Sequence, residues 1–326
     1  MGSLNSTFIS QYGPFVDNIL FDVASHWNGD SSSMEGLFFP LARHKSWYDG
    51  HSFSSGLFSS ANGKSQVSSS EAVNCYYAAY LWSSVRNSNI LADSADLMDF
   101  ARLLLATEIR GAKKYWHMTP SKVVPNRTSL FDPALYDDSF ARNYMVGTLG
   151  MLDAFASTWF GANPLYVHMI NFLPVTAITY ELFDKEYVEE QYGSVIEPLN
   201  ASILAGWKGY TVCDHAFVDP YSAWQDAQSL VNAEVDSGLS KSQVLYWISS
   251  YTGFKYVVSS DDDDNDTAAL ETSMLSSSCE DNAECAILGL TGFCCPTSGG
   301  FILGCCDASA SDGFRVTVVP IHRIVI

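Results

Sequence analysis

Residues 63–72 read GKSQVSSSEA and precede a strongly apolar segment that extends from Ala72 through Val85. Apolar residues in this segment recur at the spacing of one helix face. Ser68 and Glu71 have the spacing of a capping box, in which a serine hydroxyl and a glutamate carboxylate satisfy backbone amides at the start of a helix. The sequence therefore predicts a helix that begins near Ser68, with Val67 and Glu71 one turn apart on about the same face.

The same helical spacing recurs along most of the chain, whereas the alternation typical of strands is scarce. The connections 118–133 and 204–220 are long and contain aromatic residues, which is typical of loops that form a cleft. The sequence therefore predicts an all-α fold built from paired helices. The further predicted helices are 15–24, 95–115, 144–155, 166–172, 187–204 with an interruption at Pro198, 221–235 closed by Gly238, and 241–250.

The composition limits the classes of partner. The chain has 326 residues, of which 47% are hydrophobic and 16% charged, so it can bury a large core. Its net charge of -19 opposes binding to nucleic acid or to an anionic membrane surface. No apolar run reaches the length of a membrane span. A neutral polysaccharide is compatible with this charge, because it carries none itself.

Two local patterns look like cofactor sites but lack required residues. The run DDDDND at 261–266 has Asp266 where a calcium-binding EF-hand loop needs glycine, and Thr272 where it needs glutamate. The triplet GKS at 63–65 lacks the first glycine of a phosphate-binding loop, because Phe58 stands there. The sequence therefore predicts no cofactor and no metal site.

The C-terminal part differs in composition from the helical part, and we predict a boundary after residue 258. Residues 259–278 are expected to form an acidic, serine-rich linker, 279–307 a cystine-rich module, and 308–326 a tail. Adjacent cysteine pairs in the module do not match the spacing of zinc ligands, so disulfides are the better interpretation. The cysteines concerned are Cys279, Cys285, Cys294, Cys295, Cys305 and Cys306.

Glycosylation patterns, together with these disulfides, favour secretion. Asn5, Asn126, Asn200 and Asn265 each begin an Asn-x-Ser/Thr triplet. We therefore expect an extracellular or cell-wall glycoprotein. The two remaining cysteines, Cys75 and Cys213, are expected to be buried small apolar residues rather than reactive thiols.

Several longer motifs run through the helical part of the chain. They are WYDGHSF at 47–53, GKSQVSSSEA at 63–72, WFGANP at 159–164 with HMI at 168–170 and LPVT at 173–176, WKGY at 207–210, and DP at 219–220 with Trp224. This set resembles glycoside hydrolase family 81, the inverting endo-β-1,3-glucanases, from about Gln11 to Ser250. The resemblance implies an incomplete (α/α)6 toroid with its gap on the N-terminal side, a chain truncated at its N-terminus relative to the family, a monomer, and β-1,3-glucan as partner.

The resemblance also implies catalytic roles. Inverting hydrolysis uses one carboxylic acid to protonate the leaving oxygen and one carboxylate to activate water. Where the family has its general base, this chain has Val67, and the family's general-acid motif does not occur before Trp47. Glu71 is therefore the motif carboxylate expected to be catalytic. Two alternatives stay open: a non-catalytic protein that binds β-1,3-glucan, and an incomplete gene product whose full form carries the acid.

A glucan cleft needs flat aromatic side chains beside polar groups, because a sugar ring has an apolar C–H face and a polar rim. His51 and His168 fit equally well as hydrogen-bonded scaffold residues. Asp49 fits equally well as a turn former before Gly50. The residues that we predict to bind substrate are Trp47, Tyr48, Asp49, His51, Gln66, Trp116, Trp159 and His168.

Overall fold

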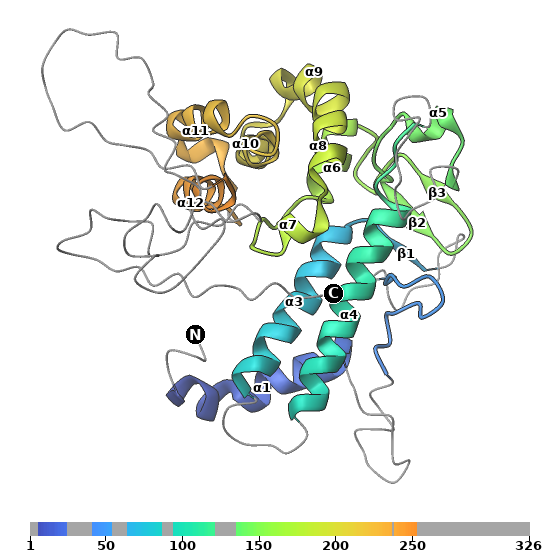
Figure 1. Cartoon of the computed structure of the whole chain (residues 1–326), viewed down its shortest axis with the longest axis vertical. Coiled ribbons are helices and arrows are strands. Elements are labelled where there is room, and N and C mark those ends of the chain that lie inside the picture. Colours follow the sequence, from blue (N-terminus) through green and yellow to red (C-terminus); the bar gives the residue numbers. More distant parts are fainter. Residues whose placement is uncertain are drawn as a thin grey trace, which may run out of the picture. The chain divides into compact units, whose positions relative to one another are not determined.

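The computed structural model describes residues 6–24, 41–53, 64–86, 94–120, 135–236 and 238–252. The chain divides into two compact units, Met1–Trp247 and Ile248–Ile326, and the first is described below. The described residues are mostly helical, as the sequence predicted, with three short strands (Figure 1). No helix among them is long and apolar enough to cross a membrane. The predicted linker, cystine-rich module and tail lie outside the described residues, and the toroid stays a prediction.

Among the described residues, three long helices come first, with a short strand between the first two of them, and a short helix, two further strands and a series of shorter helices follow. The first helices are α1 (Ser6–Ala24), α3 (Ser69–Arg86), α4 (Ser94–Tyr115) and α5 (Asp138–Ala141), and the strands are β1 (Ser65–Gln66), β2 (Thr148–Gly150) and β3 (Ala154–Phe155). The later helices are α6 (Pro164–Ile170), α7 (Thr179–Leu182), α8 (Lys185–Gln191), α9 (Glu197–Leu199), α10 (Lys208–His215), α11 (Pro220–Ser229) and α12 (Lys241–Thr252). A π-helical turn, η2 (Tyr192–Ile196), and the 3-10 turns η3 (Asn200–Ser202), η4 (Ala205–Trp207) and η5 (Asn232–Glu234) connect them.

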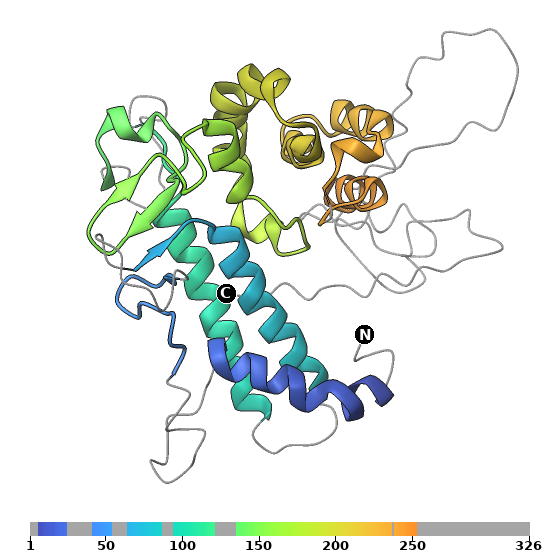
Figure 2. The same cartoon turned by 180° about the vertical axis from the view of Figure 1, so that it is seen from behind.

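Helices α3 and α4 lie side by side, and α1 packs against α3 (Figures 1 and 2). Each of the two paired helices buries residues three or four positions apart, which is the spacing of one helix face. In α3 the buried residues include Val73, Tyr76, Ala79 and Ser83. In α4 they include Ala101, Leu104, Leu105, Glu108 and Ala112.

Aromatic rings fill the core among the later helices. Phe172 is 1% exposed, and its ring centroid lies 5.1 Å from that of Phe183 and 6.4 Å from that of Phe217. Trp247 adds a fourth ring, 6.3 Å from Phe172. Ring pairs at these distances add to the stability of a core, in addition to the contribution of the apolar area that they bury. Each ring comes from a different stretch of chain, so the cluster holds α6, α7, α10 and α12 to one another.

Asn171, the residue after α6, caps the N-terminus of α3. Its Oδ1 accepts hydrogen bonds from the backbone N of Ser69 at 2.9 Å and from Ser69 Oγ at 3.0 Å. Its Nδ2 donates to the backbone oxygens of Val146 at 3.3 Å and Val167 at 3.0 Å. The side chain is fully buried, and all four bonds are to groups that would otherwise need water. One carboxamide therefore joins α3, α6 and the segment that leads into β2.

The serines on either side of Ser69 add to the same junction. Ser68 Oγ donates to the backbone oxygen of Ile170 at 2.8 Å and accepts from the backbone N of Glu71 at 3.2 Å. Ser70 Oγ donates to the backbone oxygen of Leu173. The bond to Glu71 is the serine half of the predicted capping box, and α3 begins at Ser69, one residue after the predicted start. The three serines thus bind the turn after α6 rather than solvent.

The predicted helix 144–155 is wrong, because this segment contains β2 and β3. The two strands are antiparallel with Thr148 opposite Phe155, and β2 also pairs with β1, where Gly150 lies opposite Ser65. Gly147 explains the error: a Cβ at this position would lie 2.5 Å from the backbone oxygen of Ser157. The chain can therefore double back only with glycine here.

Other predictions also need correction. The predicted loop 204–220 contains a helix, α10, whose residues from Gly209 to Asp214 are all buried. The predicted helix 187–204 is a helical run from Lys185 to Ser202 that changes from α to π to α to 3-10, with Pro198 in the first turn of α9. Cys213 is buried as expected, and burial raises the pKa of its thiol. Cys75, in contrast, is exposed on α3, because it lies outside the buried face of that helix.

We predict that Asn171→Ala lowers the free energy of unfolding by about 3 kcal/mol or more, measured by urea denaturation followed by circular dichroism. The substitution leaves the backbone N–H of Ser69 and the carbonyls of Val146 and Val167 buried without partners, and each such group costs about 1–3 kcal/mol.

Asn163→Ala provides the control. Asn163 caps α6 at an exposed position, where its Oδ1 accepts from the backbone N of Leu165 at 3.0 Å. Loss of one exposed cap costs about 1 kcal/mol. Equal losses in the two variants would contradict the junction role of Asn171.

Candidate functional site

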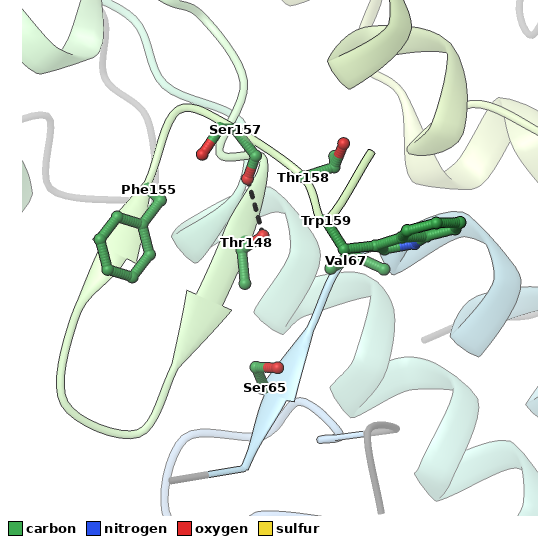
Figure 3. A pocket seen from close by; sticks show the side chains of 7 residues that line it. All are labelled: Ser65, Val67, Thr148, Phe155, Ser157, Thr158 and Trp159. Carbon is green, nitrogen blue, oxygen red and sulfur yellow. Dashed lines mark hydrogen bonds between the residues drawn. The ribbon is translucent and has the colours of Figure 1, made fainter. Parts of the chain in front are cut away.

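A pocket of about 390 Å³ opens beside the three-stranded sheet (Figure 3). We call it the Val67 pocket, after the residue that stands where the family resemblance places a catalytic glutamate. Its seven lining residues are Ser65, Val67, Thr148, Phe155, Ser157, Thr158 and Trp159. They come from β1 and the residue that follows it, from β2 and β3, and from the segment after β3, so segments far apart in the sequence form the pocket together.

Hydrogen bonds within the sheet hold the polar lining. Thr148 Oγ1 donates to the backbone oxygen of Ser157 at 2.7 Å, a bond drawn in Figure 3. Thr158 Oγ1 donates to the backbone oxygen of Gly161 at 3.1 Å, within a turn in which Gly161 has a φ of 144°. That turn carries Trp159, whose indole is 82% exposed. The backbone at the pocket is therefore fixed, while its largest aromatic group faces solvent.

The chemistry of the lining favours an uncharged ligand. The seven residues include two aromatic rings, one valine and four hydroxyl groups, and no carboxylate or cation. Aromatic faces and hydroxyls suit a molecule with an apolar face and a polar rim. General acid–base catalysis needs a titratable side chain within hydrogen-bond reach of the ligand. These seven residues therefore include no side chain that could act as a general acid or base.

Glu71 lies in the first turn of α3 with its side chain exposed, and it is not among the seven lining residues. A carboxylate in a first turn also interacts favourably with the helix dipole. Its catalytic role stays a prediction. The geometry differs from the predicted one in one respect: Val67 precedes the helix, so the two residues are not one helical turn apart on a common face.

The motif at 47–53 divides into an exposed part and a buried part. Trp47 is 47% exposed and Tyr48 98% exposed, so both rings are accessible. Asp49 accepts a hydrogen bond from Ser46 Oγ at 2.8 Å, which fixes the turn before Gly50, whose φ is 85°. The turn-forming alternative for Asp49 is thus realised.

His51 lies in the core. It is 2% exposed, and its ring centroid lies 4.6–5.2 Å from those of Phe53, Tyr115 and Trp116. Burial lowers its pKa below the ordinary value for histidine, which keeps the ring neutral. A Cβ on Gly111 would lie 2.8 Å from the Cβ of His51, so α4 approaches this loop closely. In the described structure His51 packs the loop against α4.

The other predicted site residues are mostly buried. Gln66 is 1% exposed and donates through Nε2 to the backbone oxygen of Ser68 at 3.1 Å. Trp116 is fully buried, and His168 is 2% exposed, with Nε2 lying 2.9 Å from the backbone oxygen of Asn143. Of the predicted substrate-binding residues, Trp159 lines the Val67 pocket and the others do not. Their roles in binding stay predictions.

The sequence interpretation missed five polar or aromatic residues of the pocket: Ser65, Thr148, Phe155, Ser157 and Thr158. Thr148 and Phe155 were missed because the apolar spacing of residues 144–155 predicts a helix, whereas Ser65, Ser157 and Thr158 reach the pocket only through the pairing of the strands. Gly147 and Gly150 were the available signal, since two glycines three positions apart weaken a helix and suggest a tight turn or bulge.

A buried ion pair holds the loop that carries the 47–53 motif. Lys45 Nζ lies 2.7 Å from Glu108 Oε2, and both side chains are at most 1% exposed. Glu108 also accepts from the backbone N of Ser52 at 3.0 Å and from Ser52 Oγ at 2.9 Å, and Ser52 Oγ lies 2.8 Å from Tyr76 Oη. The glutamate therefore joins this loop to α4, and through Ser52 to α3.

Among the described residues, no group of three or more His, Cys, Asp or Glu side chains is placed to hold a metal ion.

Comparison with known proteins gives consistent matches. A family model described as "Glycosyl hydrolase family 81 C-terminal domain" matches residues 1–248. "Glucan endo-1,3-beta-D-glucosidase 2" of Saccharomyces cerevisiae is 26% identical over 253 residues, which cover 77% of this chain and 29% of that protein. "Primary septum glucan endo-1,3-beta-D-glucosidase" of Schizosaccharomyces pombe is 26% identical over 233 residues, which cover 71% of this chain and 21% of that protein.

A solved structure shares the fold. It is a mutant of "Glycoside hydrolase family 81 from Clostridium thermocellum", with a TM-score of 0.59 and 24% sequence identity. The match covers 76% of this chain and 31% of that one. The chain therefore spans less than a third of the length of the relatives that it matches.

We predict that Glu108→Gln lowers the free energy of unfolding by about 3–5 kcal/mol, because it leaves the buried Lys45 ammonium without a counter-charge. Urea denaturation measures the loss. The double variant Lys45→Met with Glu108→Gln should recover much of it, since no buried charge remains. A single variant as stable as the wild type would show that the pair does not hold the loop.

Proposed function

The chain belongs to glycoside hydrolase family 81, and on that premise we propose that it acts on β-1,3-glucan, which it binds in the Val67 pocket. The observation that carries the proposal is the lining of this pocket: an exposed indole and a phenyl ring stand beside four hydroxyls, with no charged group among the seven residues. A neutral glucan presents the matching surfaces.

We further propose that this chain hydrolyses glucan weakly at best. An inverting glycosidase needs two carboxyl groups on opposite sides of the scissile bond. The pocket has Val67 at the position of the family's base, and Glu71 is the one motif carboxylate nearby in the sequence. Loss of a positioned base alone removes about two to four orders of magnitude in rate. If hydrolysis occurs, it is endo-acting and inverting, as in the family.

The second candidate function is glucan binding without hydrolysis. The absence of a carboxylate from the seven residues that line the Val67 pocket favours it. Release of reducing sugar from laminarin, compared with retention of the protein on a laminarin gel, separates the two. Retention without release supports binding alone. Release that Glu71→Gln abolishes supports hydrolysis, and neither retention nor release would refute both.

The name of the fission yeast relative includes "Primary septum", which supports a site of action at the cell wall. We therefore propose an extracellular or cell-wall location for this chain. The predicted disulfides and most of the glycosylation triplets lie outside the described residues and stay predictions.

We predict that Trp159→Ala weakens retention on laminarin by about 10-fold or more, which corresponds to about 1.4 kcal/mol. The indole supplies the largest accessible aromatic face at the pocket, and truncation of such an anchor typically costs more than 1 kcal/mol. Affinity electrophoresis with laminarin in the gel measures the change.

Phe15→Ala is the matched control, because Phe15 is 72% exposed but lies on α1 and does not line the pocket. Its retention should equal that of the wild type. Equal weakening in the two variants would show that exposed aromatic area in general, and not the Val67 pocket, binds the gel.

We predict that Val67→Glu raises reducing-sugar release from laminarin by about two orders of magnitude, because it supplies a carboxylate at the family's base position. Val67→Gln, which has the same shape without the charge, should give no increase. If the two variants release sugar at the same rate, Val67 does not occupy the place of a functional base.

A further inference from the structure

Asp214 on α10 is a carboxyl group in the core. It is 1% exposed, and both of its oxygens contact Gln191 Nε2, at 3.0 Å and 2.7 Å. Within the described residues it forms no ion pair. A buried charge with one neutral donor and no counter-ion is strongly unfavourable, and such groups usually take up a proton instead.

Two nearby polar atoms have no hydrogen-bond partner. Gln191 Oε1 and His168 Nδ1 are both buried and unpaired. The Gln191 side chain lies close enough to the His168 ring to affect its pKa. His168 Nε2 lies 2.9 Å from the backbone oxygen of Asn143, so Nε2 carries the proton and donates. Nδ1 is then an acceptor that needs a donor.

One rearrangement would give each of these atoms a partner. The oxygen and nitrogen of a glutamine amide have nearly the same shape, and their assignment follows from the hydrogen bonds that they make. If the Gln191 amide is reversed, Nε2 donates to His168 Nδ1 and Oε1 faces Asp214. A protonated Asp214 then donates to Oε1. The result is a continuous chain of donors from Asp214 through Gln191 and His168 to Asn143.

We propose that Asp214, Gln191 and His168 form a proton-dependent clamp, which joins α10, α8 and α6 while Asp214 carries a proton and weakens when that proton is lost. The clamp does not depend on the proposed function, because it lies in the core and none of its residues lines the Val67 pocket.

The surroundings oppose a charge on Asp214. The titratable groups next to Asp214 are Tyr192 of η2 and Cys213 of α10. Burial raises the pKa of both, and the carboxyl of Asp214 raises them further. The other charged groups around α10 are mainly acidic or already paired. Glu197 and Asp219 are acidic. His215 lies 3.4 Å from Asp226, and Lys208 lies 2.6 Å from Glu234. Asp236 accepts a hydrogen bond from the Tyr210 hydroxyl at 2.9 Å.

The pH window follows from the two titrating groups. Burial raises the pKa of Asp214 from 3.8 to about 8. The stability that the protonated carboxyl gives the folded state is therefore complete below pH 3.8 and is lost as the pH rises to about 8. Burial lowers the pKa of His168 from 6.5 to about 4, so its contribution is lost as the pH falls from 6.5 to about 4. The two slopes oppose each other between about 4 and 6.5. The net loss of stability therefore falls between about pH 6.5 and 8.

Asp214→Asn tests the clamp in the full chain, with thermal unfolding measured by circular dichroism at about pH 6 and about pH 9. The asparagine amide can donate to Gln191 Oε1 as the protonated carboxyl does, but it does not titrate. We expect the wild-type Tm to fall by roughly 5 °C or more between about pH 6 and about pH 9. The Tm of the variant should change less over this range. At about pH 9 the Tm of the variant should exceed that of the wild type.

Asp219→Asn is the control, because Asp219 is an N-cap carboxylate at an accessible position and its hydrogen bonds to Ser222 lower its pKa. Its Tm should differ from that of the wild type by the same amount at both pH values. The proposal is overturned if Asp214→Asn keeps the wild-type pH dependence, or if it is less stable than the wild type at about pH 9.

A measurement on the wild type keeps the test valid if the variant does not fold. With ¹³C at the aspartate carboxyl carbons, one signal should have the chemical shift of a protonated carboxyl at about pH 6 and should titrate near pH 8. With ¹⁵N-labelled histidine, one buried ring should keep its proton on Nε2 across this range. If every carboxyl signal is that of an ionised group at about pH 6, the clamp does not exist.

Discussion

The capping of α3 by Asn171 is the constraint on which the rest of the described structure depends. A helix that begins in the core leaves backbone N–H groups that water cannot reach, and these groups must find partners from elsewhere in the chain. Here the partner comes from a residue about a hundred positions away, with the neighbouring serines bound to the same turn. This junction fixes where α3 starts, and with it the position of Val67 two residues earlier.

The same requirement explains why the motif residues are divided between core and surface. Gln66, His51 and His168 are buried and bonded to backbone, whereas Trp159, Tyr48 and Trp47 face solvent. The Lys45–Glu108 pair holds the loop that carries the 47–53 motif, in the way that Asn171 holds the start of α3. Buried polar groups of this kind favour a single arrangement, because every alternative leaves one of them unpaired.

We propose that the Val67 pocket keeps a surface for glucan while it lacks the carboxylate of the family's base. A glutamate at position 67 would place a carboxylate beside the Trp159 indole, whereas valine makes the same surface apolar. Binding depends on shape and exposed aromatic area, which the sheet and the turn at Gly161 supply. Hydrolysis depends on two carboxyl groups at a set separation. Binding and hydrolysis therefore depend on different side chains.

The sequence by itself predicted α3, α4, the part of α1 from Phe15 to Ala24, and the family, because these helices have apolar residues at helical spacing and the motifs stand in consecutive stretches of chain. It did not predict the first nine residues of α1. It also singled out Trp159, which lines the Val67 pocket. Only the tertiary structure decided that residues 144–155 form strands, that Trp116 and His51 lie in the core, and that Asp214 meets Gln191. The physical reason is that helical periodicity is a local property, whereas strand pairing, burial and the partners of buried polar groups depend on residues distant in the chain.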